Sequence, residues 1–179
     1  MSSKLIINRH TSKRDGENTL AFIQDLKNRM EGRFQLTSDA LSWYWQGCGG
    51  IVGKVCGKDI DYATEMKVFN QRPIDKKQWY NPLAVVAIKR QHRCGNPDMK
   101  LATTCHAERT NLSVRIFTRR FTCKTLGYSK KLENLRYAVA LFVAHFNFCR
   151  VHSAHGRTPA QAANLTDHHW TIEELLTAS

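Results

Sequence analysis

The sequence has no long apolar run, and this absence narrows what the protein can be. The longest aliphatic stretch, residues 138–144, is far shorter than the roughly 20 residues that a helix needs to cross a bilayer. Near the N-terminus, residues 5–7 are apolar, which is too short a run for a secretory signal peptide. We therefore expect a cytoplasmic protein without membrane contacts, whose cysteines stay reduced.

Acidic residues are also scarce. The 179-residue chain has 15 Asp and Glu against 27 Lys and Arg, a formal net charge of +12. Such an excess favours a polyanionic partner, most commonly nucleic acid, over a small-molecule substrate. A solvated basic surface is the alternative explanation. The length fits one domain of ordinary size, and 42% hydrophobic residues can build a core.

Paired C-x-x-C motifs are absent, which argues against a structural zinc site. Two sets of residues come nearest to a set of zinc ligands. One has two cysteines and a histidine, and the other has two cysteines. These are Cys94, Cys105 and His106, and Cys48 with Cys56. We expect the four histidines near the C-terminus, His152, His155, His168 and His169, to be surface or packing residues.

The first half of the chain predicts strands around one helix. Apolar residues at helical spacing follow the acidic start at residues 15–17, and Gly32 should end that helix. Strands are predicted on either side of it, at residues 4–8 and 33–38. A strand–helix–strand order indicates a crossover unit and hence an α/β fold. Further strands are predicted at 62–69, 83–88 and 99–104, the last two flanking a turn at 94–98, whereas glycine-rich residues 43–58 predict a loosely packed loop.

The second half predicts helices. One should span residues 106–124, and a second should begin after Ser129 as its N-cap. Two short helices are predicted at Thr158-Pro159 and at residues 171–177. We expect a domain over residues 1–150 and a helical tail over 151–179. Apolar residues of the second helix recur in steps of three and four and predict a buried stripe: Leu132, Leu135, Val139, Phe142, Phe146 and Cys149.

Two carboxylates are candidates for a metal site. Asp39 ends the predicted strand at 33–38, and Glu108 begins a helix. A carboxylate at a strand end and another on a helix can together hold a divalent ion for phosphoryl transfer. Helical spacing places Asn111 and Arg115 on the same face as Glu108. An acid in the first turn of a helix is also ordinary compensation of the helix dipole, so this helix alone does not decide the matter.

Basic residues on and after the same helix form a candidate surface for a phosphate backbone. A solvated basic face is the alternative reading of the same pattern. The candidate DNA-binding residues, including two from the Glu108 face, are Arg109, Asn111, Arg115, Arg119, Arg120, Lys124, Lys130 and Lys131.

In this order, these motifs resemble DDE-superfamily transposases of the insertion-sequence-one group. The matching segments are residues 33–39, 108–112, 119–122, 124–131, 137–152, 157–160 and 170–176. The resemblance implies a ribonuclease H-like fold and a site in which three carboxylates bind two divalent ions, Mg²⁺ or Mn²⁺. Such enzymes cut double-stranded DNA at the element ends with water and join the 3′ hydroxyls to target DNA. By the matching motifs, Asp39 is the second acid and Glu108 the third.

The first acid of that pattern has no match in this chain. The resemblance places it on a strand that precedes the segment matching residues 4–10, and neither Asp15 nor Asp25 lies there. We therefore expect an N-terminally truncated transposase, without the first two strands of the fold and catalytically incomplete. Two alternatives stay open. In the first, another polypeptide or frameshifted translation supplies the missing acid. In the second, the chain is a non-catalytic DNA-binding protein or a regulator that acts through a homodimer.

Overall fold

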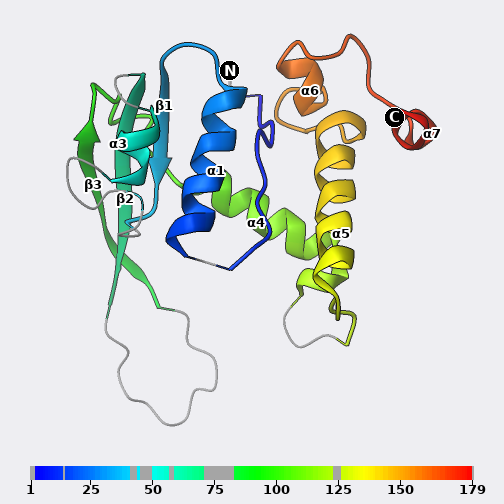
Figure 1. The fold of residues 1–179 in the computed structure, drawn as a ribbon, viewed down its shortest axis with the longest axis horizontal. Helices are drawn as coiled ribbons and strands as arrows, with labels where there is room; N and C mark the ends of the chain where they lie inside the picture. The colour runs from blue at the N-terminus through cyan, green and yellow to red at the C-terminus, as the bar shows by residue number, and fades with distance from the viewer. Residues whose placement is uncertain are drawn as a thin grey trace. The chain divides into compact units, whose positions relative to one another are not determined.

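The computed structural model describes residues 3–13, 15–40, 44, 50–56, 59–70, 83–122 and 126–178. It is mixed α/β, as predicted, and separates into two compact units (Figure 1). One unit, Arg14–Cys105, contains the β-sheet and is called the sheet unit. The other joins Met1–Lys13 to His106–Ser179 and is called the helical unit.

The sheet unit is built on three strands in the order β1-β2-β3. β1 (Phe34–Ser38) pairs in parallel with β2 (Ile60–Phe69), and β2 pairs antiparallel with β3 (Val85–Cys94). The short helix α3 (Ile51–Cys56) lies between β1 and β2 in the chain. The crossover that makes the fold α/β is therefore β1–α3–β2, because parallel neighbours need a connection across the sheet.

Helix α1 (Gly16–Arg29) packs on one face of the sheet unit together with α3. It begins where predicted because the Asp15 side chain accepts a hydrogen bond of 2.9 Å from the Asn18 backbone N–H. Ile23 of α1 and Val52 of α3 are buried against Ile60 and Tyr62 of β2. Burying each of these large apolar side chains contributes about 1.5–3 kcal/mol.

Residues 95–104, here called the crossing segment, cover the opposite face of β2. Its residues bind Gln35, Asp61 and Glu65, which alternate with the core residues Ile60 and Tyr62 and therefore point to the other side. The strand predicted at 99–104 is wrong, because the backbone there forms turns. The strand predicted at 83–88 is the first part of β3, which continues to Cys94.

The glycine-rich stretch contains an element that its composition hid. Residues 51–56 form α3, and Val52 of that helix is 1% exposed, so this part is not the loosely packed loop that we predicted. Tyr44 also packs against the core cluster. The remainder of the predicted loop, residues 43, 45–49 and 57–58, lies outside the described residues.

The helical unit contains α4 (Cys105–Phe117), a 3₁₀ turn η1 (Arg119–Phe121), α5 (Leu132–Ala144), a π-helical turn η2 (His145–Cys149), α6 (Pro159–Ala162) and α7 (Ile172–Thr177). α4 ends seven residues before the predicted Lys124. The Thr122 hydroxyl donates to the Arg115 carbonyl oxygen at 3.1 Å, satisfying a carbonyl that the helix end leaves without an internal partner. α5 begins with Lys131, not Ser129, at its N-cap.

The two short helices at the C-terminal end are confirmed. Each starts with a capping box, in which a threonine hydroxyl accepts from the third helical N–H and that residue's side chain accepts from the threonine N–H. The pairs are Thr158 with Gln161 and Thr171 with Glu174. Both helices contact η2, so the end of the chain is anchored on the continuation of α5.

Two other predictions for the helical unit are corrected. Residues 4–8 form no strand; instead, the Asn147 side chain donates to and accepts from the Ile6 backbone, at 3.0 Å in each case. The predicted buried stripe is only partly buried, since Phe146 is 4% exposed but Leu132 is 51% exposed. Within the described part of the chain, no helix is long and apolar enough to span a bilayer.

Candidate functional site

Asp39 follows directly after the last residue of β1 and is exposed. Ser38 holds this strand end: its hydroxyl lies 2.7 Å from the Tyr62 hydroxyl and 2.8 Å from the Asp39 carbonyl oxygen. Burial raises the pKa of Tyr62, and the nearby Asp39 charge acts in the same direction. The sheet therefore presents an aspartate at the carboxyl end of a parallel strand, where side chains of α/β folds commonly meet a ligand.

Glu108 lies in the first turn of α4 and is also exposed. Asn111 and Arg115 follow it at the spacing that places them along one side of the helix, and both are exposed. Leu112, at the same spacing, is 43% exposed. The predicted face of α4 is therefore a polar, accessible surface that can meet a ligand.

The two candidate acids belong to different units, Asp39 to the sheet unit and Glu108 to the helical unit. Carboxylate oxygens are the donors that Mg²⁺ and Mn²⁺ prefer, so both residues fit such an ion in kind. Across the described residues, no three His, Cys, Asp or Glu side chains gather into a potential metal-binding group.

Glu65 is an acid of β2 that the sequence did not single out. Ser38, the last residue of β1, pairs with Thr64, so Glu65 is the first residue of β2 beyond this parallel pairing. However, Glu65 is only 4% exposed and already bound. It accepts from Arg90 Nε at 2.9 Å, from the Thr104 N–H at 3.0 Å and from the Thr104 hydroxyl at 2.9 Å. These bonds make it a tether for the crossing segment.

The electrostatics of Glu65 agree with that structural role. Burial alone would raise the pKa of its carboxyl group, but the hydrogen bonds from Thr104 and Arg90 outweigh it, and the pKa is lowered. One signal of this role was available in the sequence. In the alternation of β2, Asp61 and Glu65 fall on one face, opposite Ile60 and Tyr62.

Asp61 is the second acid that holds the crossing segment. Its carboxylate is bound by the Arg33 guanidinium and by the Asn96 backbone N–H. These bonds lower the pKa of Asp61 to about 2, with the Arg33 hydrogen bond as the largest cause. Asp61 and Glu65 are therefore committed to contacts within the sheet unit.

The candidate DNA-binding residues all lie in the helical unit. Arg109, Asn111 and Arg115 are on α4, and Arg119 and Arg120 are on η1. Lys130 and Lys131 precede α5, whereas Lys124 lies outside the described residues. All seven described residues are exposed, and Arg120 donates to the Ser129 hydroxyl at 2.9 Å. Exposed cations of this kind contact phosphate oxygens rather than read bases.

The zinc alternative meets competing contacts at two of its residues. Cys94 packs against the hydrophobic core cluster of the sheet unit, and His106 Nδ1 accepts from Lys4 Nζ at 2.9 Å. Cys105 is exposed. Cys48 and the side chain of Cys56 lie outside the described residues.

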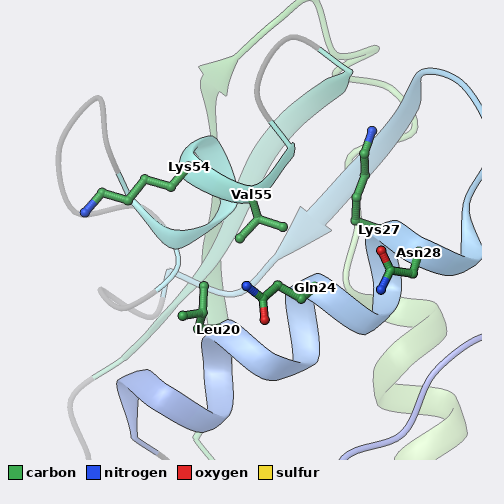
Figure 2. A pocket seen from close by; sticks show the side chains of 6 residues that line it. All are labelled: Leu20, Gln24, Lys27, Asn28, Lys54 and Val55. Atoms are coloured by element: carbon green, nitrogen blue, oxygen red, sulfur yellow. The ribbon is translucent and has the colours of Figure 1, made fainter.

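An open groove of about 610 Å³ lies between α1 and α3 (Figure 2). It is lined by Leu20, Gln24, Lys27, Asn28, Lys54 and Val55. Lys27 is already paired with Asp59 at 2.7 Å, and Lys54 extends away from the other lining side chains. None of these six residues is a candidate acid, so the groove is separate from the carboxylate at the end of β1.

Comparisons with protein-family models, with curated proteins and with solved structures find no match to this chain.

Proposed function

We propose that this chain is part of a DDE transposase with a ribonuclease H-like fold, which cleaves DNA and transfers strands with a divalent metal ion. One observation carries the proposal: Asp39 follows directly after β1 of a parallel β1–α3–β2 unit, and the exposed Glu108 lies in the first turn of a later helix. A strand-end aspartate and a helical glutamate in this order are what the resemblance to these transposases requires.

In this proposal Asp39 and Glu108 hold Mg²⁺ or Mn²⁺. The bound ion would activate the attacking water or hydroxyl and stabilise the leaving oxygen. The exposed side chains of Asn111 and Arg115 contact the DNA beside Glu108. The cations of α4, η1 and the start of α5 bind the phosphate backbone of the element ends and target, as double-stranded DNA.

The proposed site is catalytically incomplete in the chain as described. Among the described residues, β1 has a strand partner on one side only, and the nearest further acid, Glu65, is committed to Arg90 and Thr104. An unpaired strand edge is a template for another strand. An aspartate-bearing strand added at this edge of β1 would supply the third carboxylate.

Nicking of supercoiled plasmid DNA in Mn²⁺ tests the proposal without knowledge of a recognition sequence. The chain alone should give no Mn²⁺-dependent nicking. Adding the N-terminal strands of an intact transposase of the same group should produce nicking that Asp39→Asn and Glu108→Gln abolish. Glu133→Gln is the matched control for Glu108→Gln, because both glutamates lie in the first turn of a helix.

Two results would contradict parts of the proposal. Nicking by the chain alone that Glu108→Gln abolishes would show a complete site. Nicking in the mixture that survives both acid substitutions would remove Asp39 and Glu108 from the reaction.

A second candidate is a non-catalytic DNA-binding or dimeric regulatory protein. This candidate is favoured because all the described candidate cations belong to the helical unit, whereas Asp39 belongs to the sheet unit. Duplex binding that survives Asp39→Ala but falls on Arg119→Ala/Arg120→Ala, with no nicking under any complementation, would favour this candidate.

A further inference from the structure

Tyr62 is a tyrosine in the core of the sheet unit, where a phenylalanine would fill the same space. It is 2% exposed and belongs to the buried cluster with Ile23, Val52 and Ile60. A buried hydroxyl is costly without a hydrogen-bond partner, and buried tyrosines usually have one. The partner of the Tyr62 hydroxyl is the Ser38 hydroxyl, at 2.7 Å. The buried tyrosine is therefore bonded to the end of β1.

The register of the sheet shows how Tyr62 reaches Ser38. β1 and β2 lie side by side, and Tyr62 of β2 pairs with Leu36 of β1 (Figure 1). Leu36 and Ser38 are two residues apart, so the alternation of the strand places both side chains on the same face. Tyr62 therefore binds a side chain two residues nearer the carboxyl end of β1 than its own pair. Ser38 is the last residue of β1, and Asp39 follows it.

The two hydrogen bonds of Ser38 have a definite direction. Its hydroxyl lies 2.8 Å from the Asp39 carbonyl oxygen, which can only accept, so Ser38 donates to Asp39. A serine hydroxyl carries one proton, so towards Tyr62 it accepts. The Tyr62 hydroxyl therefore donates to Ser38, and Ser38 donates to Asp39. This series of bonds, here called the hydroxyl relay, runs from the core to the backbone of the candidate metal ligand.

Tyr62 keeps the proton that the hydroxyl relay needs. Burial raises the pKa of Tyr62 above its ordinary value of 10.0, the hydrogen bond with Ser38 opposes this shift in part, and the charge of Asp39 adds to it. The phenol is therefore protonated at neutral pH and is a donor throughout that range.

The hydroxyl relay binds the carbonyl group of Asp39 and makes no use of its carboxylate. Asp61 and Glu65 differ, because their carboxylates themselves accept the hydrogen bonds that hold the crossing segment. A bond to the carbonyl can fix the backbone of Asp39 without competing with a metal ion for the carboxylate oxygens. The parallel pairing of β1 with β2 ends at Ser38 and Thr64, so Asp39 lies just beyond the part of the strand that this pairing holds.

We propose that Tyr62 and Ser38 are positioning residues, which fix the backbone of Asp39 so that its carboxylate is held ready for a divalent ion. Partners that orient a metal ligand matter for affinity, and their loss commonly weakens metal binding about 10–100-fold. The inference rests on the proposed function for the ion that Asp39 holds, whereas the hydroxyl relay can be tested without metal.

Mn²⁺ binding to the full chain, measured by electron paramagnetic resonance, tests the positioning role. Ser38→Ala should weaken Mn²⁺ binding about tenfold. Tyr62→Phe should weaken it about fivefold, because it removes one hydrogen bond. The double variant should bind as Ser38→Ala does, since Tyr62 acts on Asp39 only through Ser38. Ser38→Thr keeps the hydroxyl and should bind Mn²⁺ within about twofold of the unchanged chain.

Thr37→Val is the matched control, because it removes a hydroxyl from the preceding residue of β1. It should change Mn²⁺ binding less than about twofold. Equal weakening by Thr37→Val and Ser38→Ala, or losses that add in the double variant, would overturn the positioning role. If the Ser38 variants do not fold, the comparison of Tyr62→Phe with Thr37→Val decides the matter, because Tyr62→Phe adds no atom to the core.

NMR of the metal-free chain tests the hydroxyl relay by itself. Tyr62→Phe keeps the ring and should move the carbonyl carbon-13 signal of Asp39, but not that of Leu36, which pairs directly with Tyr62. Equal movement of the two signals, or movement of neither, would overturn the hydroxyl relay.

The two measurements separate failure of this inference from failure of the proposed function. If Asp39→Asn weakens Mn²⁺ binding but Ser38→Ala and Tyr62→Phe do not, the positioning role is overturned and the metal site stands. If Asp39→Asn leaves Mn²⁺ binding unchanged while the Asp39 carbonyl signal still moves in Tyr62→Phe, the metal site fails and the hydroxyl relay is supported.

Discussion

At the scale of single residues, two acids of β2 hold the crossing segment to the sheet. Glu65 is buried and binds Arg90 and Thr104, whereas Asp61 binds Arg33 and Asn96. An exposed ion pair contributes little to stability, but removal of one partner of a buried group leaves the other without its bonds. The two acids should therefore differ from the exposed acids of the same unit.

Glu65→Ala should lower the free energy of unfolding by about 2–4 kcal/mol, since it leaves Thr104 and Arg90 without their acceptor. Chemical denaturation measures this change. The exposed Glu31→Ala is the control and should change stability by no more than about 0.5 kcal/mol. Equal effects of the two substitutions would contradict the role of Glu65 as a tether.

Asp61 makes stability depend on pH in the acid range. Its pKa is about 2 in the folded protein against an ordinary value of 3.8, so the ionised carboxylate stabilises the fold above that ordinary value. This contribution should be lost as the pH falls from about 4 towards 2. Denaturation at a series of pH values should show that the free energy of unfolding falls less between pH 4 and pH 2 for Asp61→Asn than for Asp25→Asn. An equal fall in the free energy of unfolding for both variants would contradict this role of Asp61.

At the scale of elements, two glycines test how closely the crossing segment approaches β2. Gly32 and Gly95 both have positive φ, 67° and 72°. A Cβ atom at Gly32 would meet nothing within 4 Å, whereas one at Gly95 would overlap the Asp61 carboxylate and the Ile60 carbonyl. The pair therefore separates the cost of backbone conformation from the cost of lost space.

Gly32→Ala should cost about 1–2 kcal/mol, the price of a left-handed residue. Gly95→Ala should cost about 1–3 kcal/mol more, because the crossing segment must also move away from β2. Thermal or chemical unfolding of both variants measures the difference. A smaller loss for Gly95→Ala than for Gly32→Ala would contradict the close packing at this turn.

Elements with local signals were predictable from the sequence. α1, α6 and α7 each begin at a side chain that caps the helix, and Asp15, Thr158 and Thr171 identify those starts. The prediction failed where long-range bonds decide. Residues 99–104 have a strand-like composition, but the bonds of Glu65 and Gln35 hold the crossing segment in turns. The backbone of residues 4–8 is likewise determined by a distant partner, because Ile6 binds the side chain of Asn147, which is 141 positions away in the sequence.

The candidate site was predictable only in part. The place of Asp39 directly after a strand was predicted, because residues 33–38 have a strand-like composition and β1 does end at Ser38. Glu65 was missed because the alternation of β2 shows which face carries its side chain, but not that Thr104 and Arg90 bind it there.

At the scale of the whole molecule, the net charge of +12 should control binding to duplex DNA. The logarithm of the affinity should fall linearly with the logarithm of salt concentration, because each Lys or Arg side chain that binds a phosphate releases counterions from the DNA. Arg119→Ala/Arg120→Ala should reduce that slope by about 2, roughly one for each lost phosphate contact. Fluorescence anisotropy over a range of salt measures the slope. An unchanged slope would exclude η1 from the DNA contact.

The central claim is that Asp39 and Glu108 share a divalent ion, and Mn²⁺ binding measured by electron paramagnetic resonance tests it most directly. Asp39→Asn and Glu108→Gln should each weaken Mn²⁺ binding at least about tenfold, and the double variant should lose little more, because residues that act on one ion are not additive. Asp25→Asn and Glu133→Gln are the matched controls. Single variants that bind like these controls, or fully additive losses in the double variant, would contradict the claim.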